Sequence, residues 1–218
     1  MGIAGINPLY LILGLALLGL APFLLMLVTS YVKIVVVTSL VRNALGVQQV
    51  PPAMVMNGLA IILTVFIMAP VAMDTADIVR NITLPAQPGF SDILSVADKA
   101  SPPLRRFLAA NSDEKVTNMF MGTARRIWPA ERHDMISRDN LLIMIPAFTI
   151  SELTKAFQIG FVLYLAFVAI DLIISNILLA MGMMMVSPTT ISLPFKLLLF
   201  VTLDGWLKIS QGLMLSYQ

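Results

Sequence analysis

The chain has 218 residues, of which 58% are hydrophobic and 12% charged, whereas an ordinary soluble domain carries about 25% charged residues. This composition excludes an ordinary soluble domain and predicts an integral membrane protein, or one buried inside a membrane-embedded assembly. The net charge of +2 argues against a nucleic-acid partner, and the absence of cysteine excludes disulfides, thiolate metal sites and cysteine nucleophiles.

Charged residues are distributed unevenly along the chain. Residues 1–73 carry only Lys33 and Arg42, residues 74–140 carry nine basic and nine acidic side chains, and residues 141–218 carry six charges. This pattern predicts an all-α protein in which two hydrophobic helical blocks, built of kinked helices and hairpins, flank a small soluble helical insert. Short loops that carry Lys or Arg favour the cytoplasmic side, so the Arg42 loop predicts a periplasmic insert.

The first hydrophobic block is too long for a single straight span. The apolar run from Pro8 to Val41 contains Pro22, which removes a backbone donor, so we expect a kink or a division there. Lys33 lies deep in this run and needs a partner, or must extend its amine to an interface. No basic residue precedes the run, which is longer than a signal peptide, so we expect the segment to be retained. Residues 53–73 suit one further span.

The insert shows two helix starts. Ser101 followed by a proline matches an N-cap and the first helical position, which predicts a short helix. Asn111 with Glu114 three residues later matches a capping box, and predicts a second helix that Pro129 ends. His133 is the only histidine, and one histidine without cysteine makes a poor metal site, so we interpret it as a surface side chain.

The second hydrophobic block predicts a long helix, a break and a final helix. Thr149 with Glu152 three residues later matches a capping box, from which a helix runs to about Met181. This helix is too long for one span, so we expect a kink or a hairpin. The break covers residues 181–190, and Ser192-Leu193-Pro194 then restarts a helix with proline in its first turn.

We expect five of the six charged residues of the second block to lie at bilayer depth. Each costs about 2.5–3.5 kcal/mol at the centre of a bilayer, so all must be paired, within the chain or across subunits. Two interpretations remain open: a polar belt facing a pore or proton pathway, and a structural network between helices. On the last helix, Asp204 and Lys208 continue a stripe that begins at Lys196, with acid before base at the favourable spacing. The five residues are Glu152, Lys155, Asp171, Lys196 and Asp204.

Four methionines surround the expected helix break, at Met181, Met183, Met184 and Met185. One interpretation is that these methionines fill gaps in a core, as methionine usually does. Another is that they are apolar side chains that face lipid. Four thioethers at a break instead favour a soft lining that closes a pore and yields when a polypeptide is pushed through. The sequence holds no nucleophile–base pair, phosphate loop or metal cluster, so we predict neither an enzyme nor a cofactor.

Five stretches of the two hydrophobic blocks resemble one protein family. They read VRNALGVQQVPP at 41–52, NGLAIILTVFIMAP at 57–70, IPAFTISELTKAFQIGF at 145–161, IDLIIS at 170–175 and LLAMGMMMVSPTTISLPFKLLLFVTLDGW at 178–206. On these residues the chain resembles the FliP/SctR family, also called YscR or SpaP, of export-gate proteins in bacterial type III secretion systems. Two positions depart from the family: Thr154 stands where lysine is usual, with Lys155 next to it, and Ala166 stands where proline is frequent.

The resemblance implies a homo-oligomer of five copies in a conical helical complex, together with SctS/FliQ-like, SctT/FliR-like and SctU/FlhB-like partners. Such a complex passes unfolded secretion substrates across the bacterial inner membrane, as a multi-pass assembly with much of its mass on the periplasmic side. Met183, Met184 and Met185 would contribute to a gasket, while Glu152 and Lys196 would join a charged inter-subunit network. The apparent lack of a cleavable signal favours a virulence or symbiosis injectisome over a flagellum.

A second hypothesis is a stand-alone ion- or proton-coupled membrane transporter that uses Asp171 and the Glu152–Lys155 pair. The two hypotheses differ in assembly. An export gate requires a large hetero-oligomer, whereas a transporter tolerates a monomer or a dimer with substrate-dependent flux.

Overall fold

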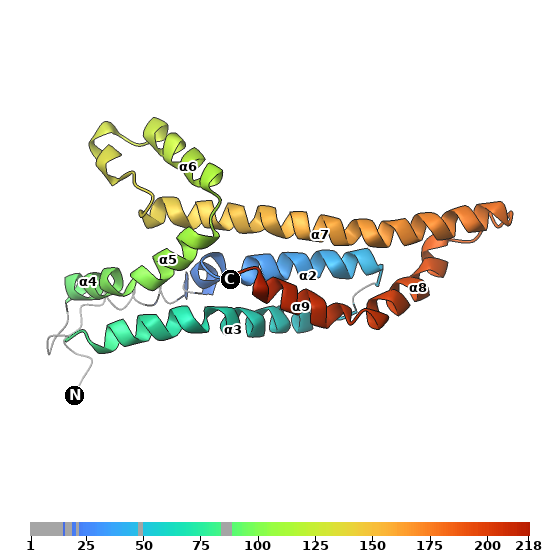
Figure 1. The fold of residues 1–218 in the computed structure, drawn as a ribbon. Coiled ribbons are helices and arrows are strands. Elements are labelled where there is room, and N and C mark those ends of the chain that lie inside the picture. Colours follow the sequence, from blue (N-terminus) through green and yellow to red (C-terminus); the bar gives the residue numbers. More distant parts are fainter. Residues whose placement is uncertain (1–14, 16–18, 21, 48–49, 84–88) are drawn as a thin grey trace.

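A computed structural model describes residues 15, 19–20, 22–47, 50–83 and 89–218 of the chain. Within these residues all regular structure is helical, which confirms the all-α prediction (Figure 1). The elements are α2 (Tyr31–Leu45), α3 (Ala53–Arg80), α4 (Phe90–Ala100), α5 (Pro102–Asn111), α6 (Glu114–Ile127), the 3-10 helix η2 (Ala130–Met135), α7 (Leu141–Ala180), α8 (Pro188–Thr202) and α9 (Gly205–Leu215).

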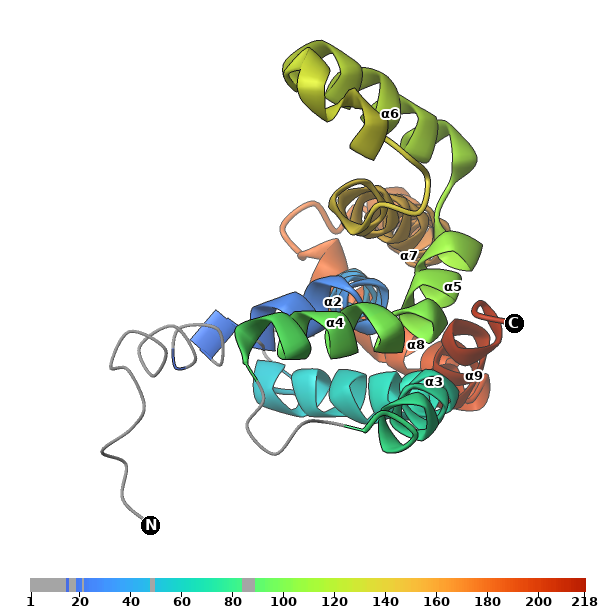
Figure 2. The ribbon, with the colours of Figure 1, turned by 90° about the vertical axis from the view of Figure 1, so that its left-hand side faces the viewer.

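Helix α2 lies in the centre of the molecule, between the two longest helices (Figure 1). Helix α7 packs along one side of α2 and α3 along the other. Helix α8 folds back from the far end of α7, and α9 continues from α8 to reach α3. In the end-on view, α6 projects away from the remaining helices beyond α7 (Figure 2). Because α2 contacts α3, α7 and α8, it forms the centre of the core.

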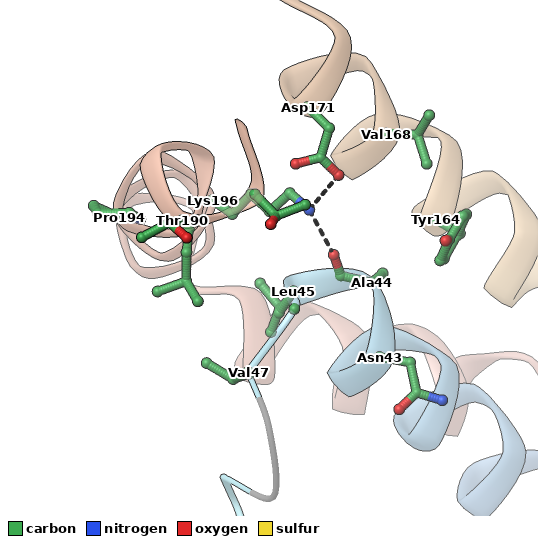
Figure 3. Close-up of a pocket in the computed structure, with 13 residues that line it drawn as sticks. Asn43, Ala44, Leu45, Val47, Tyr164, Val168, Asp171, Thr190, Pro194 and Lys196 are labelled. Atoms are coloured by element: carbon green, nitrogen blue, oxygen red, sulfur yellow. Dashed lines mark hydrogen bonds and ion pairs between the residues drawn. The ribbon is translucent and has the colours of Figure 1, made fainter. Parts of the chain in front are cut away.

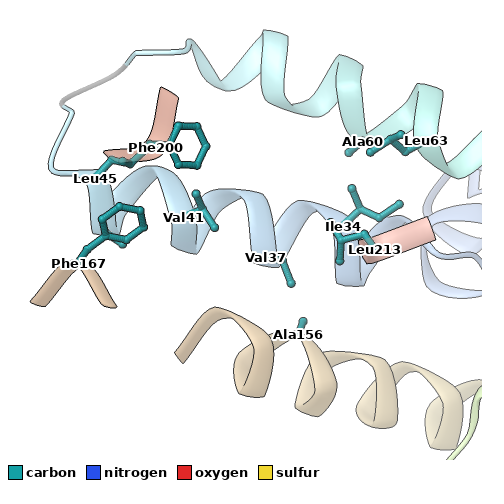
Figure 4. Packing of buried hydrophobic residues seen from close by; sticks show 11 residues of the cluster. Ile34, Val37, Val41, Leu45, Ala60, Leu63, Ala156, Phe167, Phe200 and Leu213 are labelled. Carbon is teal, nitrogen blue, oxygen red and sulfur yellow. The ribbon is translucent and has the colours of Figure 1, made fainter. Parts of the chain in front are cut away.

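The core follows one apolar stripe of α2. Ile34, Val37 and Val41 recur at helical spacing and are fully buried, against residues of α3, α7, α8 and α9 (Figure 4). Burial of one such side chain contributes about 1.5–3 kcal/mol. The complete cluster consists of Ile34, Val37, Val41, Ala44, Leu45, Ala60, Leu63, Ala156, Phe167, Phe200 and Leu213.

Gly160 allows α7 to approach α2 closely. A β-carbon at this position would lie 2.2 Å from Cδ1 of Leu40, which is well inside van der Waals contact. The absence of a side chain at Gly160 therefore permits Leu40 of α2 to pack directly on the backbone of α7.

Helix α7 is a single helix of 40 residues, which corresponds to about 60 Å or twice the hydrocarbon thickness of a bilayer. Of the kink or hairpin expected inside it, the hairpin is wrong, because residues 141–180 form one continuous helix. The one proline within α7, Pro146, lies near its start. The start predicted at Thr149 is also wrong. Asn140 caps the helix by accepting the Leu142 N–H at 2.9 Å, and the Thr149 hydroxyl donates to the Ile145 carbonyl inside the helix. Burial of the apolar residues after Asn140 extends the helix beyond the sequence signal.

The insert helices begin close to the predicted positions. Ser101 occupies the N-cap of α5, as expected, although its side chain makes no capping hydrogen bond. The capping box at Asn111 is wrong, since Asn111 is the last residue of α5 and donates to the Phe107 carbonyl. Asp113 caps α6 instead, and accepts the backbone N–H of Lys115 at 2.7 Å.

The final helix is divided in two. Helix α8 begins at Pro188, ahead of the predicted restart at 192–194, because Pro188 already satisfies the first-turn preference for proline. Asp204 has a φ of 51°, and the axes of α8 and α9 differ by 58°. The predicted stripe through Asp204 and Lys208 is therefore wrong, since a residue in the left-handed region interrupts the helical periodicity.

Two predictions for the first block meet the described residues only in part. Residues 22–27 are helical and a break follows at 28–30, whereas the division expected at Pro22 adjoins Ala21, which lies outside the described residues. Helix α3 continues past Met73 to Arg80, and it includes Pro70 in its interior.

Helices α3 and α7 are each long and apolar enough to cross a membrane, and the bent pair α8–α9 passes the same test when taken together. Only 17% of the most apolar stretch of α3 and 11% of that of α7 is buried within the chain. Their exposed apolar faces therefore require lipid or other protein for cover.

Candidate functional site

The four predicted methionines lie in the turn that joins α7 to α8, which we call the methionine loop (Met181–Ser187). Gly182 ends α7 with a φ of 74°, while the N–H of Met183 donates to the Leu178 carbonyl and the N–H of Gly182 to the Leu179 carbonyl. These two bonds form a Schellman motif, which needs a residue that tolerates the left-handed region. The sequence therefore predicted the break correctly from its glycine and its following proline.

All four methionine side chains of the loop are exposed within one chain. Their exposed fractions are 62% for Met181, 44% for Met183, 81% for Met184 and 101% for Met185. The loop lies at the end of the molecule opposite to the insert (Figure 1). The core-filler interpretation is thus wrong for this chain, and the loop presents a cluster of flexible apolar side chains outward.

One buried charge cluster forms around Glu152, which we call the Glu152 cluster. The Lys33 ammonium lies 3.1 Å from Glu152 Oε2, with side-chain exposures of 1% and 0%. Lys155 donates to Glu152 Oε1 at 3.3 Å and to the Asn111 carbonyl at 2.6 Å. The Tyr217 hydroxyl donates to Glu152 Oε2. Lys33 therefore has the partner that its depth in the first block required.

Tyr217 lies just beyond α9, and its surroundings keep it protonated. Burial, together with the nearby carboxylate of Glu152, raises the pKa of the Tyr217 phenol far above its ordinary value. In the structure the phenol donates its hydrogen bond to Glu152 Oε2.

A second charge cluster, the Asp171 cluster, lies between α7 and α8 (Figure 3). The Lys196 ammonium is 2.6 Å from Asp171 Oδ2 and donates to the Ala44 carbonyl at 3.1 Å. Ser192 donates to the other oxygen of Asp171. Because Ala44 belongs to the last turn of α2, the ammonium also meets the negative end of that helix dipole. This cluster therefore ties α2, α7 and α8 together.

A pocket of about 620 Å³ adjoins the Asp171 cluster (Figure 3). The Asp171 side chain is 29% exposed, so it is the less buried member of its ion pair. Among the described residues, no group of three or more His, Cys, Asp or Glu side chains is placed to hold a metal ion. The residues that line the pocket include Asn43, Ala44, Tyr164, Val168, Asp171, Thr190, Pro194 and Lys196.

The structure brings together four of the five predicted charged residues, in two separate clusters. Glu152 and Lys155 lie in one cluster, and Asp171 and Lys196 in the other. Asp204 joins neither cluster and is exposed at the elbow between α8 and α9. These ion pairs close within one chain, so the burial of charge does not by itself require a neighbouring subunit.

Sequence reasoning missed two residues of these clusters, Tyr217 and Ser192. Tyr217 lies 65 residues from Glu152 in the chain, and Ser192 lies 21 residues from Asp171. Neither separation produces a periodic signal, so only the packing of the helices identifies the contacts.

Apolar helices of membrane-spanning length, with charges paired in the interior, place the chain in the class of α-helical membrane proteins. The sequence pattern of the FliP family matches residues 14–213, and the chain belongs to that family.

Several relatives match nearly the whole chain, three of them as follows. It is 51% identical over 210 residues to the Yop proteins translocation protein R of Yersinia pestis, with 95% of each chain covered. It is 50% identical over 200 residues to the virulence protein YscR of Salmonella typhimurium, with 92% of each covered. It is 46% identical over 203 residues to the hypersensitivity response secretion protein HrcR of Ralstonia nicotianae, with 92% of this chain and 93% of that one covered. These matches confirm the resemblance found in the sequence.

Proposed function

We propose that this chain is a pore-forming structural subunit of a type III secretion export gate, without catalytic activity. The observation that carries the proposal is the methionine loop, whose four methionines are exposed by 44–101% at the turn between two apolar helices. Apolar side chains gathered in this way favour contact with an apolar partner. In a ring of copies, the loops cover one another around the axis and close the pore.

The construction of the loop suits a seal that opens and closes. Methionine has three rotatable bonds and a polarizable sulfur, so its side chains fill an irregular opening and repack around a passing polypeptide. The Asp171 cluster ties the two helices that carry the loop, α7 and α8, to the end of α2. The methionine side chains of the loop are therefore free to rearrange, while the Asp171 cluster holds the helices that carry the loop in place.

The proposed assembly contains five copies of the chain with SctS/FliQ-like, SctT/FliR-like and SctU/FlhB-like partners, and passes unfolded protein substrates. The exposed apolar faces of α3 and α7 support it, since these faces need cover from lipid or protein. In this assembly Glu152, Lys155, Asp171, Lys196 and Asp204 belong to a charge network whose ion pairs close within each copy. The network extends between subunits through its more exposed members, Lys155, Asp171 and Asp204. Asp204 is the best placed for such a contact, because it is exposed within an apolar helix pair.

The proposed location is the bacterial inner membrane, as a multi-pass protein with much of the assembly on the periplasmic side. The chain then divides into hydrophobic blocks 1–73 and 141–218 around a periplasmic insert, 74–140. The length of α7 supports this arrangement, because a helix of about 60 Å extends beyond a single hydrocarbon layer.

Leak of a small molecule through assembled complexes tests the gasket. Replacement of Met183, Met184 and Met185 by alanine shortens the side chains, so we expect normal assembly and a raised leak. Leucine at the same positions restores apolar volume and lowers the leak again. Met119→Ala, at an exposed methionine of α6, serves as the control and leaves the leak unchanged. An unchanged leak in fully assembled alanine variants contradicts the gasket.

One observation favours a second candidate, a stand-alone ion- or proton-coupled transporter. The partly exposed Asp171 adjoins a pocket, and both charge clusters close within one chain. Purification in detergent followed by mass measurement separates the two functions, since the export gate requires a large hetero-oligomer. Asp171→Asn abolishes flux through a transporter, whereas in an export gate it mainly disturbs assembly.

A further inference from the structure

Tyr217 contacts three other helices at one point. Its hydroxyl donates to Glu152 of α7, and its ring covers the Lys33 ammonium of α2 at 3.5 Å from the ring centroid. The ring also stacks on Phe107 of α5, with centroids 5.8 Å apart and planes inclined by 17°. The residue thus joins the end of the chain to both hydrophobic blocks and to the insert.

The Glu152 cluster uses both parts of the tyrosine. Two ammonium groups, of Lys33 and Lys155, share a single carboxylate, so the cluster carries an excess positive charge. Lys33 is 1% exposed, and the negative face of the tyrosine ring is attracted to its ammonium. The phenol adds a hydrogen bond to Glu152 Oε2, and bonds to charged acceptors are stronger than neutral ones.

The segment that ends in Tyr217 packs on the core through one face of α9. We call it the C-terminal arm and define it as α9 with residues 216–218. It leaves α8 at the elbow formed by Asp204. Leu213 belongs to the buried core cluster, and Trp206, Ile209 and Met214 pack against that cluster as partly buried side chains. Trp206 packs edge-on against Phe200 near the elbow, with centroids 5.2 Å apart. Beyond Met214, Tyr217 holds the last residues of the arm against α2, α5 and α7.

We propose that Tyr217 is a positioning residue that latches the C-terminal arm onto the buried Lys33–Glu152 pair. Docking of the arm and integrity of the Glu152 cluster are then coupled, and the coupling is reciprocal, as for any two linked equilibria. Undocking exposes the ion pair to water, and loss of the ion pair releases the arm. This latch does not depend on the proposed pore.

Hydrogen–deuterium exchange of the backbone amides of α9, in the purified native complex, tests the latch. Tyr217→Phe keeps the ring and removes the hydroxyl, so we expect exchange in α9 to accelerate by about tenfold. Tyr217→Leu removes the ring as well and accelerates exchange further. Tyr164→Phe is the control. This tyrosine lies on α7 and is 43% exposed, so we expect its replacement to leave the exchange rate of α9 unchanged.

A second background separates a latch from a general loss of stability. In the double variant Lys33→Met with Glu152→Leu, the phenol has lost its charged acceptor, so Tyr217→Phe no longer changes α9 exchange. An equal acceleration by Tyr217→Phe in both backgrounds overturns the proposal. The proposal is also overturned if the amides of α9 exchange at the wild-type rate in both the Tyr217→Phe and the Tyr217→Leu variant, whatever the double variant shows. Neither readout measures leak, so failure of the latch is distinct from failure of the gasket.

Discussion

Removal of the Lys33 ammonium gives the sharpest test of the Glu152 cluster. Lys33→Met retains most of the side-chain volume but leaves the Glu152 carboxylate, which is 0% exposed, without its most buried counterion. Loss of one partner of a buried ion pair costs about 3–5 kcal/mol. Lys155 at 3.3 Å and Tyr217 remain on the carboxylate, so we expect the lower end, about 3 kcal/mol. This is a large part of a typical domain stability of about 5–15 kcal/mol.

The free energy of unfolding in detergent, measured by denaturant titration, checks this value. Replacement of both partners, as Lys33→Met with Glu152→Leu, removes the uncompensated charge, so we expect the double variant to regain most of the loss. Lys208→Met, at an exposed lysine of α9, is the control and changes stability by less than about 0.5 kcal/mol. The reasoning is refuted if Lys33→Met is as stable as the wild type, or if the effects of the two substitutions simply add.

Two glycines lead to further predictions, both readable from thermal unfolding in detergent. Gly160→Ala brings a β-carbon to 2.2 Å from Leu40, so we expect a loss of about 1–3 kcal/mol, whereas Gly122→Ala in open space on α6 stabilises by about 0.5–1 kcal/mol. Equal effects at these two positions would show that α2 and α7 are not in close contact. Gly182→Ala forces a side chain into the left-handed region and costs about 1–2 kcal/mol, while Gly182→Asn costs less. If alanine is tolerated as well as asparagine, the turn that ends α7 is not the one described.

Local sequence signals succeeded where neighbouring residues decide the conformation. The break after α7 follows from Gly182 and Pro188, since glycine accepts a positive φ and proline suits a first helical turn. The capping boxes at Thr149 and Asn111 failed, because a matching pair of residues also occurs inside or at the end of a helix. Burial of Phe148 and its apolar neighbours extends α7 through that position.

The charged residues show how far an energetic argument reaches. The cost of an unpaired charge left two alternatives for Lys33, a partner or extension of its amine to an interface, and the structure shows the partner. The same argument did not identify the partner, because Glu152 lies 119 residues away along the chain. The pairs also close within one chain. The predicted oligomer therefore depends on the exposed apolar helices and on the likeness to the FliP family.

Composition and local pattern alone determined that the chain is helical, too apolar to be an ordinary soluble domain, and interrupted at a methionine-rich turn. These properties follow from residue types and their neighbours, so they need no knowledge of the fold. Only the tertiary structure decided that α2 lies between α3 and α7, which carbonyl and carboxylate hold Lys196, and that Tyr217 returns to Glu152. Such contacts join distant residues through the packing of helices against one another, and no periodicity along the chain encodes them.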